Sequence, residues 1–390
     1  MLEWEVEGLE DLANQKKVVH LTTVHHPFDT RIYHKECVSL KQAGYHVSLI
    51  VPLENASKGT IQETEEGIRL VSLPKQKKLL KRMLTSTWQA YQLAKSENAD
   101  IYHFHDPELL WVGWLLQKKG YHVIYDVHEN YYTGIMQKDY LKNWMKKIVG
   151  GVFNKVESFF IKNLEVCIAE KYYRERYPNS FELLNYPIIN TSLMDHYHTK
   201  ERPDNVLIYT GNVTSVRGAY EHATLPQLKS QPDIYFYGLC DAALADQMKQ
   251  TAADKKDHLH FTGIDQFVPR EDIDQAYQSK DWLAGVAIFP KTPHYMRKEL
   301  TKFFEYMAAG LPIVCSNFPT WQAFIDRYQC GLTVDPERPE TWEEALTYLR
   351  DHPKERRQMI KNGREAIRNE LNWEVEKLKL LGEYQQILKG

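Results

Sequence analysis

The sequence predicts an α/β protein made of two doubly wound, Rossmann-like domains. Three observations support this fold class. Short apolar strands alternate with amphipathic helices through both halves of the chain. The alternation begins again at residues 206–213, VLIYTGNV, after a polar link that contains Pro203. With 390 residues, the chain is long enough to bury two separate hydrophobic cores.

These observations set the expected domain boundaries. We expect an N-terminal extension at residues 1–16, a first domain at 17–202 and a second domain at 203–370. Residues 371–390 should form a last helix that crosses back to the first domain. Two facing domains of this kind bind a ligand in the cleft between them, at the carboxyl ends of their strands.

The expected elements of the first domain follow in order. Strands are expected at 17–24, 45–51, 100–106, 121–129 and 166–169, with a strand pair at 63–73. Helices are expected at 31–43, 79–97, 109–118 and 139–163. Because strand and helix alternate, the strands should be parallel and their connections right-handed.

The second domain repeats the pattern, with strands at 206–213, 234–238, 258–263, 285–290 and 313–316. A helix at 299–309 has apolar residues at i, i+3, i+4, i+7 and i+8, ends at Gly310 and cannot continue past Pro312. Its opposite face should carry Lys298, Lys302 and Glu305. These side chains either meet a ligand or form a charged face in solvent.

Composition narrows the classes of function. A net charge of −3 and a pI near 6.6 provide no general attraction to nucleic acid. The chain has no apolar run of about 18 residues, and its N-terminus is too acidic for a signal peptide, so we expect a cytoplasmic protein. Five widely spaced cysteines predict buried, reduced thiols.

The loop after the first strand, HHPFDTR at 25–31, lies where an open α/β sheet binds ligands. It lacks a G-x-G-x-x-G pattern, which argues against NAD. Asp29 and Arg31 are candidates to meet a ligand there, and the alternative is that Asp29 caps the following helix. In YHFHDPELL, we expect His105 and Asp106 at a cleft edge and His103 in a structural role. No third ligand is spaced for a metal, so none is expected.

The stretch RKELTKFFEYMAAGLPIVCSNFP, residues 297–319, resembles the donor-site helix and following strand of the family-4 retaining glycosyltransferases. That family has the GT-B fold, and the resemblance extends over nearly the whole chain. It implies that Glu305 holds the ribose hydroxyls of a nucleotide-sugar. A second glutamate normally stands eight residues earlier, where this chain has Arg297.

The same resemblance assigns further residues. His128, in DVHEN, matches a histidine beside the transferred sugar, and Glu129 follows it. The residues that would meet the acceptor or the diphosphate are Asp29, Arg31, His105 and Glu129. In TGNVTSVRG, Arg217 would hold the leaving phosphate, while Asn212 stands where the family commonly has an arginine. The implied catalytic residues are His128 and Arg217. The implied donor-binding residues are Gly211, Asn212, Arg217, Gly263, Arg297, Lys298, Thr301, Lys302 and Glu305.

The resemblance implies a metal-independent, retaining transferase with no cofactor beyond its nucleotide-sugar co-substrate, for which UDP is favoured. The acceptor would be a saccharide or a lipid-linked precursor in cell-envelope polysaccharide synthesis. Two basic stretches, 75–82 and 138–162, make peripheral contact with the inner face of a membrane a further expectation. The alternatives are a GT-B nucleotide-sugar epimerase and a non-catalytic nucleotide-sugar-binding subunit, the latter favoured by Arg297 and Asn212.

Overall fold

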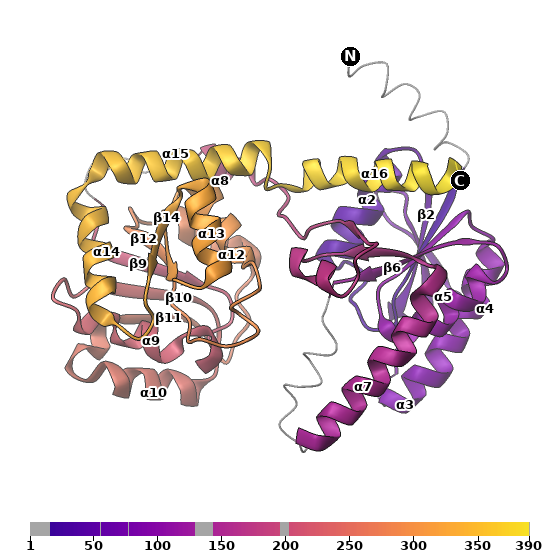
Figure 1. Cartoon of the computed structure of the whole chain (residues 1–390), viewed down its shortest axis with the longest axis horizontal. Helices are drawn as coiled ribbons and strands as arrows, with labels where there is room; N and C mark the ends of the chain where they lie inside the picture. The colour runs from indigo at the N-terminus through magenta and orange to yellow at the C-terminus, as the bar shows by residue number, and fades with distance from the viewer. Residues whose placement is uncertain (1–15, 55, 77, 129–142, 196–202, 390) are drawn as a thin grey trace, which may run out of the picture. The chain divides into compact units, whose positions relative to one another are not determined.

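The computed structural model describes residues 16–54, 56–76, 78–128, 143–195 and 203–389. The chain divides into two compact units (Figure 1). Unit 1 contains Met1–Asn185 and Glu374–Gly390, and unit 2 contains Tyr186–Trp373. The first division therefore falls earlier in the chain than the polar link at 202–205. The expected extension at 1–16 lies outside the described residues except for Lys16.

Unit 1 is built on an eight-stranded sheet with the order β3-β4-β2-β1-β5-β6-β7-β8. Its strands pair in parallel except for β3 and β4, which are antiparallel. The strands are β1 (Lys17–Leu21), β2 (His46–Leu53), β3 (Ile61–Glu63), β4 (Arg69–Pro74), β5 (Ile101–Phe104), β6 (His122–Val127), β7 (Glu165–Ile168) and β8 (Phe181–Glu182). Since β1 pairs with both β2 and β5, the strand order reverses at β1, and a ligand site is expected at its carboxyl end.

The helices of unit 1 include two π-helical segments, η1 and η2. The main helical elements are η1 (Thr30–Cys37), α2 (Val38–Gln42), α3 (Leu79–Lys81), η2 (Arg82–Ser86), α4 (Thr87–Glu97), α5 (Leu110–Gln117), α7 (Asn143–Phe160) and α16 (Trp373–Lys389). Helix α16 lies beside α2, where Lys377 Nζ donates to Gln42 Oε1 at 3.0 Å (Figure 1). Asp29 is the N-cap of η1 and accepts from the N–H groups of Arg31 and Ile32.

Unit 2 has a six-stranded, wholly parallel sheet with the order β11-β10-β9-β12-β13-β14. Its strands are β9 (Val206–Thr210), β10 (Asp233–Cys240), β11 (Leu259–Ile264), β12 (Ala284–Ala287), β13 (Ile313–Ser316) and β14 (Gly331–Val334). The strand order reverses at β9, which pairs with β10 and β12. The carboxyl ends of β9 and β12 are therefore the second place where a ligand site is expected.

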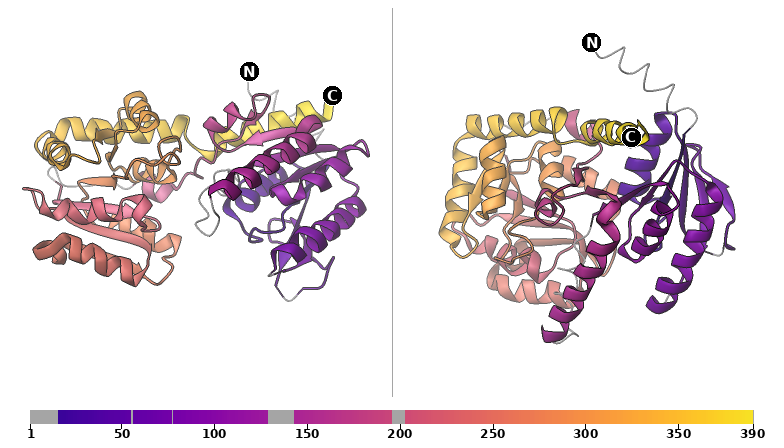
Figure 2. Two further views of the ribbon diagram at one scale, coloured as in Figure 1. Left: turned by 60° about the horizontal axis from the view of Figure 1, so that its bottom comes forward. Right: turned by 45° about the vertical axis from the view of Figure 1, so that its right-hand side comes forward.

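Helices cover both faces of this sheet. The main ones are α8 (Thr191–Asp195), α9 (Ala219–Thr224), α10 (Ala242–Ala252), α11 (Arg270–Gln278), α12 (Thr301–Ala309), α13 (Pro319–Tyr328), α14 (Pro339–Asp351) and α15 (Pro353–Asn369). Helix α10 lies on one side, whereas α14 and α15 lie on the other (Figures 1 and 2). The observed sheets confirm the expected α/β class with two parallel sheets.

All five cysteines are free and buried, as expected. None of the described helices has the length and apolar composition that a membrane span requires.

Candidate functional site

A cavity of about 230 Å³ opens at the carboxyl end of the sheet in unit 2, beside the point where the strand order reverses. The end of β9, the segment after β12 and the start of α12 form its wall. Its lining residues are Thr210, Gly211, Arg217, Phe289, His294, Tyr295, Lys298, Leu300, Thr301, Lys302 and Glu305. Six residues that the sequence places at a donor site thus lie around one cavity.

The start of α12 gives this cavity a positive electrostatic end. Leu300 is the N-cap residue, its backbone is extended, and no side chain caps the helix. The backbone N–H groups of an uncapped first turn carry partial positive charge and favour an anion. Tyr306 fixes the helix to the sheet, since its hydroxyl accepts from Thr210 N–H at 3.3 Å and donates to the Val286 carbonyl at 3.2 Å.

Lys302 places a buried cation beside this helix start. Its Nζ lies 3.5 Å from the centroid of the Tyr209 ring and 5.1 Å from that of Phe289. No hydrogen-bond acceptor among the described residues meets this nitrogen. Burial, together with the like charge of Arg217, lowers the pKa of the Lys302 ammonium well below its ordinary value. An anion in the cavity would supply the missing acceptor.

Arg217 adds a second cation. It ends the short 3₁₀ helix η6 (Ser215–Arg217), and Gly218 follows in the left-handed region with φ of 80°. The Arg217 Nε donates to the Tyr295 hydroxyl at 2.9 Å, which orients the guanidinium in the cavity wall. Burial, with the charges of Lys298 and Arg217, lowers the pKa of His294 on the same wall. The cavity therefore suits a ligand with more than one negative charge.

Glu305 is the acidic group in the wall. Its Oε1 accepts from the guanidinium of Arg270, and its Oε2 accepts from the Tyr277 hydroxyl at 3.0 Å. Tyr277 also bonds the Thr210 hydroxyl at 2.9 Å. These bonds hold the carboxylate in one orientation, and its remaining lone pairs are able to accept from the hydroxyl groups of a ligand.

Unit 1 has a histidine pair at the carboxyl ends of β1 and β6. His128 Nδ1 lies 3.2 Å from Asp126 Oδ2, and its Nε2 lies 3.0 Å from the Nε2 of His25. His25 also faces Asp106 at 3.4 Å and Asp29 at 3.6 Å. Burial alone would lower the pKa of His25, but the hydrogen bonds to these two carboxylates outweigh it and raise the pKa to about 10. His25 is therefore a cation at neutral pH.

Asp126 orients His128 and is itself held by Arg31 and His105. Arg31 binds it through two hydrogen bonds of 2.8 Å, and His105 Nδ1 donates to its Oδ2 at 3.0 Å. The Arg31 guanidinium also donates to the Leu183 carbonyl at 2.9 Å. Burial would raise the pKa of Asp126, yet the charge of Arg31 outweighs it and keeps that pKa well below its usual range.

Family comparison agrees with this arrangement. Residues 198–366 match the model described as glycosyl transferases group 1, and residues 31–169 match the model described as glycosyl transferase 4-like domain. The chain belongs to the family-4-like, group 1 glycosyltransferases. The first match contains the unit 2 cavity, and the second contains Arg31, His105 and Asp126.

Solved structures show that this glycosyltransferase has the GT-B fold. Sucrose-phosphate synthase (tll1590) from Thermosynechococcus elongatus is 16% identical, with a TM-score of 0.71, and the match covers 96% of this chain and 100% of that one. A glycosyltransferase from Rickettsia africae ESF-5 is 15% identical, with a TM-score of 0.69 and coverage of 97% and 100%. Anabaena Alr3699/HepE, solved with UDP and glucose, is 10% identical, with a TM-score of 0.67 and coverage of 95% and 100%. No curated protein matches the chain.

Three expected donor residues of the glycosyltransferase lie outside the cavity lining. Asn212 is exposed and uses its backbone carbonyl to accept from the Tyr209 hydroxyl at 3.0 Å. Gly263 lies in β11 with φ of 104°, and a Cβ there would come within 2.7 Å of the Gly238 carbonyl oxygen. Arg297 is exposed in the turn before α12. The expected helix start at 299 is wrong, since α12 begins at Thr301, so Lys298 lies before the helix rather than on its polar face.

The expected contacts of the first loop need correction. Arg31 is 5% exposed and its guanidinium is paired with Asp126, so it stabilises unit 1 from inside rather than facing a ligand. Asp29 caps η1, which is the alternative that the sequence left open. His105 is 1% exposed and lies behind His128 instead of at a cleft edge. Glu129 lies outside the described residues.

Sequence reasoning also missed functional neighbours. Asp126 carried a usable signal, because it is the one acid in the otherwise apolar buried strand HVIYDV, and a buried carboxylate needs partners. Arg270 and Tyr277, which hold Glu305, carried none, since α11 is distant in sequence. The expectation that no third metal ligand accompanies His103 and His105 is wrong, because the fold brings His20 and Glu36 beside them.

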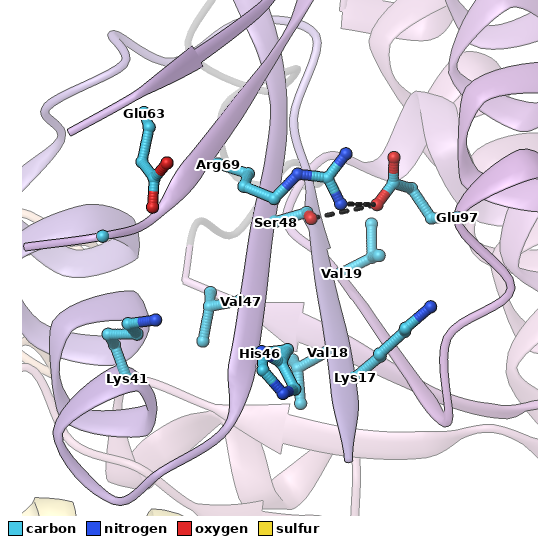
Figure 3. Close-up of a pocket in the computed structure, with 11 residues that line it drawn as sticks. Lys17, Val18, Val19, Lys41, His46, Val47, Ser48, Glu63, Arg69 and Glu97 are labelled. Carbon is cyan, nitrogen blue, oxygen red and sulfur yellow. Dashed lines mark hydrogen bonds and ion pairs between the residues drawn. The ribbon is translucent and has the colours of Figure 1, made fainter. Parts of the chain in front are cut away.

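A second cavity, of about 220 Å³, lies at the amino ends of β1, β2 and β4 in unit 1 (Figure 3). Two of its charged groups, Arg69 and Glu97, pair with each other. Glu97 accepts from Arg69 at 3.0 Å and from the Ser48 hydroxyl at 3.0 Å, as the dashed lines in Figure 3 show. Since parallel sheets bind ligands at the opposite, carboxyl ends of their strands, this cavity is not the candidate site.

Proposed function

We propose that this glycosyltransferase transfers a sugar, with retention of configuration, from a nucleoside diphosphate sugar to a saccharide or lipid-linked acceptor. The observation that carries the proposal is the cationic cavity of unit 2, where Lys302, Arg217 and the uncapped start of α12 surround one space. A diphosphate has the charge and the acceptor oxygens that these groups lack. Complexes of Anabaena Alr3699/HepE with UDP and with UDP-glucose support a UDP-sugar as the donor.

Each part of the cavity then has a role. Lys302 and the N–H groups of α12 hold the diphosphate, and Arg217 stabilises the charge that develops on the leaving phosphate. Glu305, fixed by Arg270 and Tyr277, accepts from the ribose hydroxyls. Backbone groups near Gly263 seat the base. Because basic side chains supply the positive charge, transfer proceeds without a metal in this cavity.

The proposed chemical step needs no nucleophilic side chain. The acceptor hydroxyl attacks from the face of the leaving group, and the departing phosphate takes its proton. Unit 1 binds the acceptor, and His128, oriented by Asp126, is the candidate catalytic residue of this unit. Arg297 replaces the family's first glutamate and lies outside the cavity lining. His294 and Lys298, which line the cavity, therefore make the contacts to the donor sugar.

A lipid-linked acceptor at the cytoplasmic face of a membrane fits the surface of α7. The helix exposes an apolar stripe, in which Ile148 is 57%, Val152 56% and Phe159 63% exposed. Lys155 and Lys162 are exposed nearby. Such a surface binds anionic lipid headgroups through apolar insertion and charge. Co-sedimentation with anionic vesicles tests this part, and equal binding of wild type and Phe159→Ser would contradict it.

A non-catalytic nucleotide-sugar-binding subunit is the second candidate, because Arg297 and Asn212 depart from the family pattern. Calorimetric titration with UDP, GDP and ADP, followed by assays of UDP-sugar hydrolysis, separates the two functions. We expect UDP binding together with hydrolysis or transfer. Tight UDP binding without any turnover would favour the binding subunit, and failure to bind any nucleotide would refute both.

Two variants locate the site. Glu305→Ala should weaken UDP binding about tenfold or more, and Arg217→Ala should lower turnover by about 10²-fold. Arg338→Ala is the matched control, since Arg338 is 61% exposed and pairs only with Glu340 among the ion pairs of the described residues. Wild-type kinetics in both site variants would show that the donor site lies elsewhere.

A further inference from the structure

Unit 1 contains a cluster of buried ligating side chains that the proposed transfer reaction does not use. His20 lies on β1, its register partner His103 lies on β5, His105 follows β5, and Glu36 lies on the π-helical segment η1. The four ligating atoms all lie within 4.8 Å of one another. We propose that these residues form a structural site for a divalent transition metal, with Zn²⁺ as the best fit.

The distances suit four-coordination. Glu36 Oε2 lies 3.7 Å from His20 Nδ1, 3.7 Å from His103 Nδ1 and 3.8 Å from His105 Nε2. His20 Nδ1 and His105 Nε2 are 3.0 Å apart. In a tetrahedral zinc site with bonds of about 2.0–2.1 Å, neighbouring ligand atoms are about 3.3 Å apart. Four of the six distances between ligand atoms are thus within about 0.5 Å of this value, and the other two are no longer than 4.8 Å.

Glu36 gives the independent reason to place a cation here. It is 0% exposed, and neither carboxylate oxygen has a hydrogen-bond partner among the described residues. Arg31 Nε lies 3.1 Å from Oε1, which leaves Oε2 facing the three imidazole rings. A buried carboxylate oxygen without a donor is costly, and a metal ion bonded to Oε2 removes that cost.

The neighbours of the cluster also match those of a metal ligand. His105 donates its Nδ1–H to Asp126 at 3.0 Å, so its Nε2 presents a lone pair toward Glu36. A carboxylate that fixes the far nitrogen of a ligating histidine is a common partner in zinc sites. Tyr384 bonds His103 Nδ1 at 2.8 Å and lies 3.4 Å from His20 Nε2. When the metal binds His103 Nδ1, the Tyr384 hydroxyl still has His20 Nε2 as its hydrogen-bond partner.

The set of three imidazoles and one carboxylate leaves no position for substrate, and each side chain is fully or almost fully buried. Closed sites of this kind stabilise a fold rather than catalyse a reaction. The ion would tie β1, β5 and η1 together behind the His105–Asp126–His128 chain of contacts. This role is independent of nucleotide binding in unit 2.

Metal analysis of the full-length protein tests the proposal. Protein purified without chelator should contain about one zinc per chain. Removal of zinc with a chelator should lower Tm, and 50 µM Zn²⁺ should restore it by at least about 5 °C. Co²⁺ added to the apoprotein should give the intense visible bands of a tetrahedral site. Apoprotein that shows neither a Tm shift nor these bands would overturn the proposal.

Variants assign the ligands. Glu36→Gln keeps the size of the side chain but should lower the zinc content at least fivefold and abolish the Tm response to Zn²⁺. His46→Gln is the control, because His46 is an exposed histidine on β2 and should leave the zinc content unchanged. If Glu36→Gln does not fold, the Co²⁺ spectrum of the wild-type protein still decides the question. Equal zinc content in wild type and a folded Glu36→Gln protein would refute this site.

Discussion

Replacement of Lys302 by methionine should strengthen the fold and weaken nucleotide binding at the same time. The Lys302 ammonium lies over the Tyr209 ring at 3.5 Å and has no acceptor among the described residues. Methionine has a similar length, contacts the ring through its sulfur and carries no charge. The two effects have opposite signs because the fold buries the charge without a partner, whereas a diphosphate brings one.

The magnitudes decide the direction for the free protein. Burial of an ammonium costs several kcal/mol, and the contact with Tyr209 returns about 2 kcal/mol. The lowered pKa of Lys302 agrees with a net cost. We therefore expect Lys302→Met to raise the free energy of unfolding by about 1–3 kcal/mol, which corresponds to a Tm increase of about 2–10 °C for a unit of this size.

The effect on binding follows from Coulomb's law. An ammonium about 4 Å from a phosphate charge gains about 4 kcal/mol at an effective dielectric constant of about 20. Part of this is lost to desolvation of the phosphate, so we expect the variant to lose about 2–3 kcal/mol of binding free energy. The Kd for UDP should rise about 30- to 150-fold.

Differential scanning calorimetry without ligand and titration calorimetry with UDP measure the two effects. Lys361→Met is the matched control, since Lys361 is 65% exposed on α15. The Tm of this variant should differ from that of the wild type by less than about 2 °C. A lower Tm for Lys302→Met, together with unchanged UDP affinity, would refute the reasoning. That result would mean that the ring contact stabilises the cation and that the diphosphate binds elsewhere.

Three further predictions concern buried residues that support the two units. Arg31→Met would leave Asp126 buried without its cationic partner, so it should lower the free energy of unfolding by about 3–5 kcal/mol and leave the UDP affinity of unit 2 unchanged. An unchanged Tm together with a raised KM for the acceptor would instead assign Arg31 to ligand binding. Gly218→Ala should destabilise unit 2 by about 3 kcal/mol or more in urea unfolding, because φ is 80° and the new Cβ would lie 2.0 Å from the Ile288 carbonyl oxygen. Gly151→Ala is the control: its Cβ would meet no atom within 4 Å, so this substitution should be neutral or stabilising. Burial and the charge of Lys302 lower the pKa of His222 to about 3, so below pH 6.5 the unfolded chain binds a proton that the folded chain does not, and stability falls on acidification. His222→Gln should therefore reduce the pH dependence of the unfolding free energy between pH 6.5 and 5 by up to about 1.4 kcal/mol per pH unit, and an unchanged pH dependence would contradict this.

Local patterns were sufficient to predict most of the sheet. Strand β13 was expected at 313–316 and occurs at Ile313–Ser316, because three apolar residues and a serine follow a glycine and a proline that end the preceding helix. Helix boundaries depend on distant partners and were less accurate. The Lys298 carbonyl accepts from the Trp321 indole N–H at 2.7 Å, a contact with α13 that fixes the segment before α12. No local pattern around Lys298 reveals the approach of Trp321.

The same distinction applies to the candidate site. Lys302 and Glu305 were found because helical periodicity and family resemblance both depend on local sequence, and both residues line the cavity. Whether the charge at position 302 would be buried depended on the Tyr209 ring of β9, which no periodicity indicates.

Asp126 shows why a charged residue can be predicted while its function is not. A carboxylate within the apolar strand HVIYDV must have buried partners, but their identities depend on which strands become neighbours. Once β5 pairs with β6 and Asp29 caps η1, Asp126 meets His105 and Arg31 and lies 3.2 Å from His128. Arg31 therefore contributes to the site by fixing Asp126 rather than by binding a phosphate. Its position in the loop after β1 indicated the carboxyl end of the sheet, but its contact there is with Asp126.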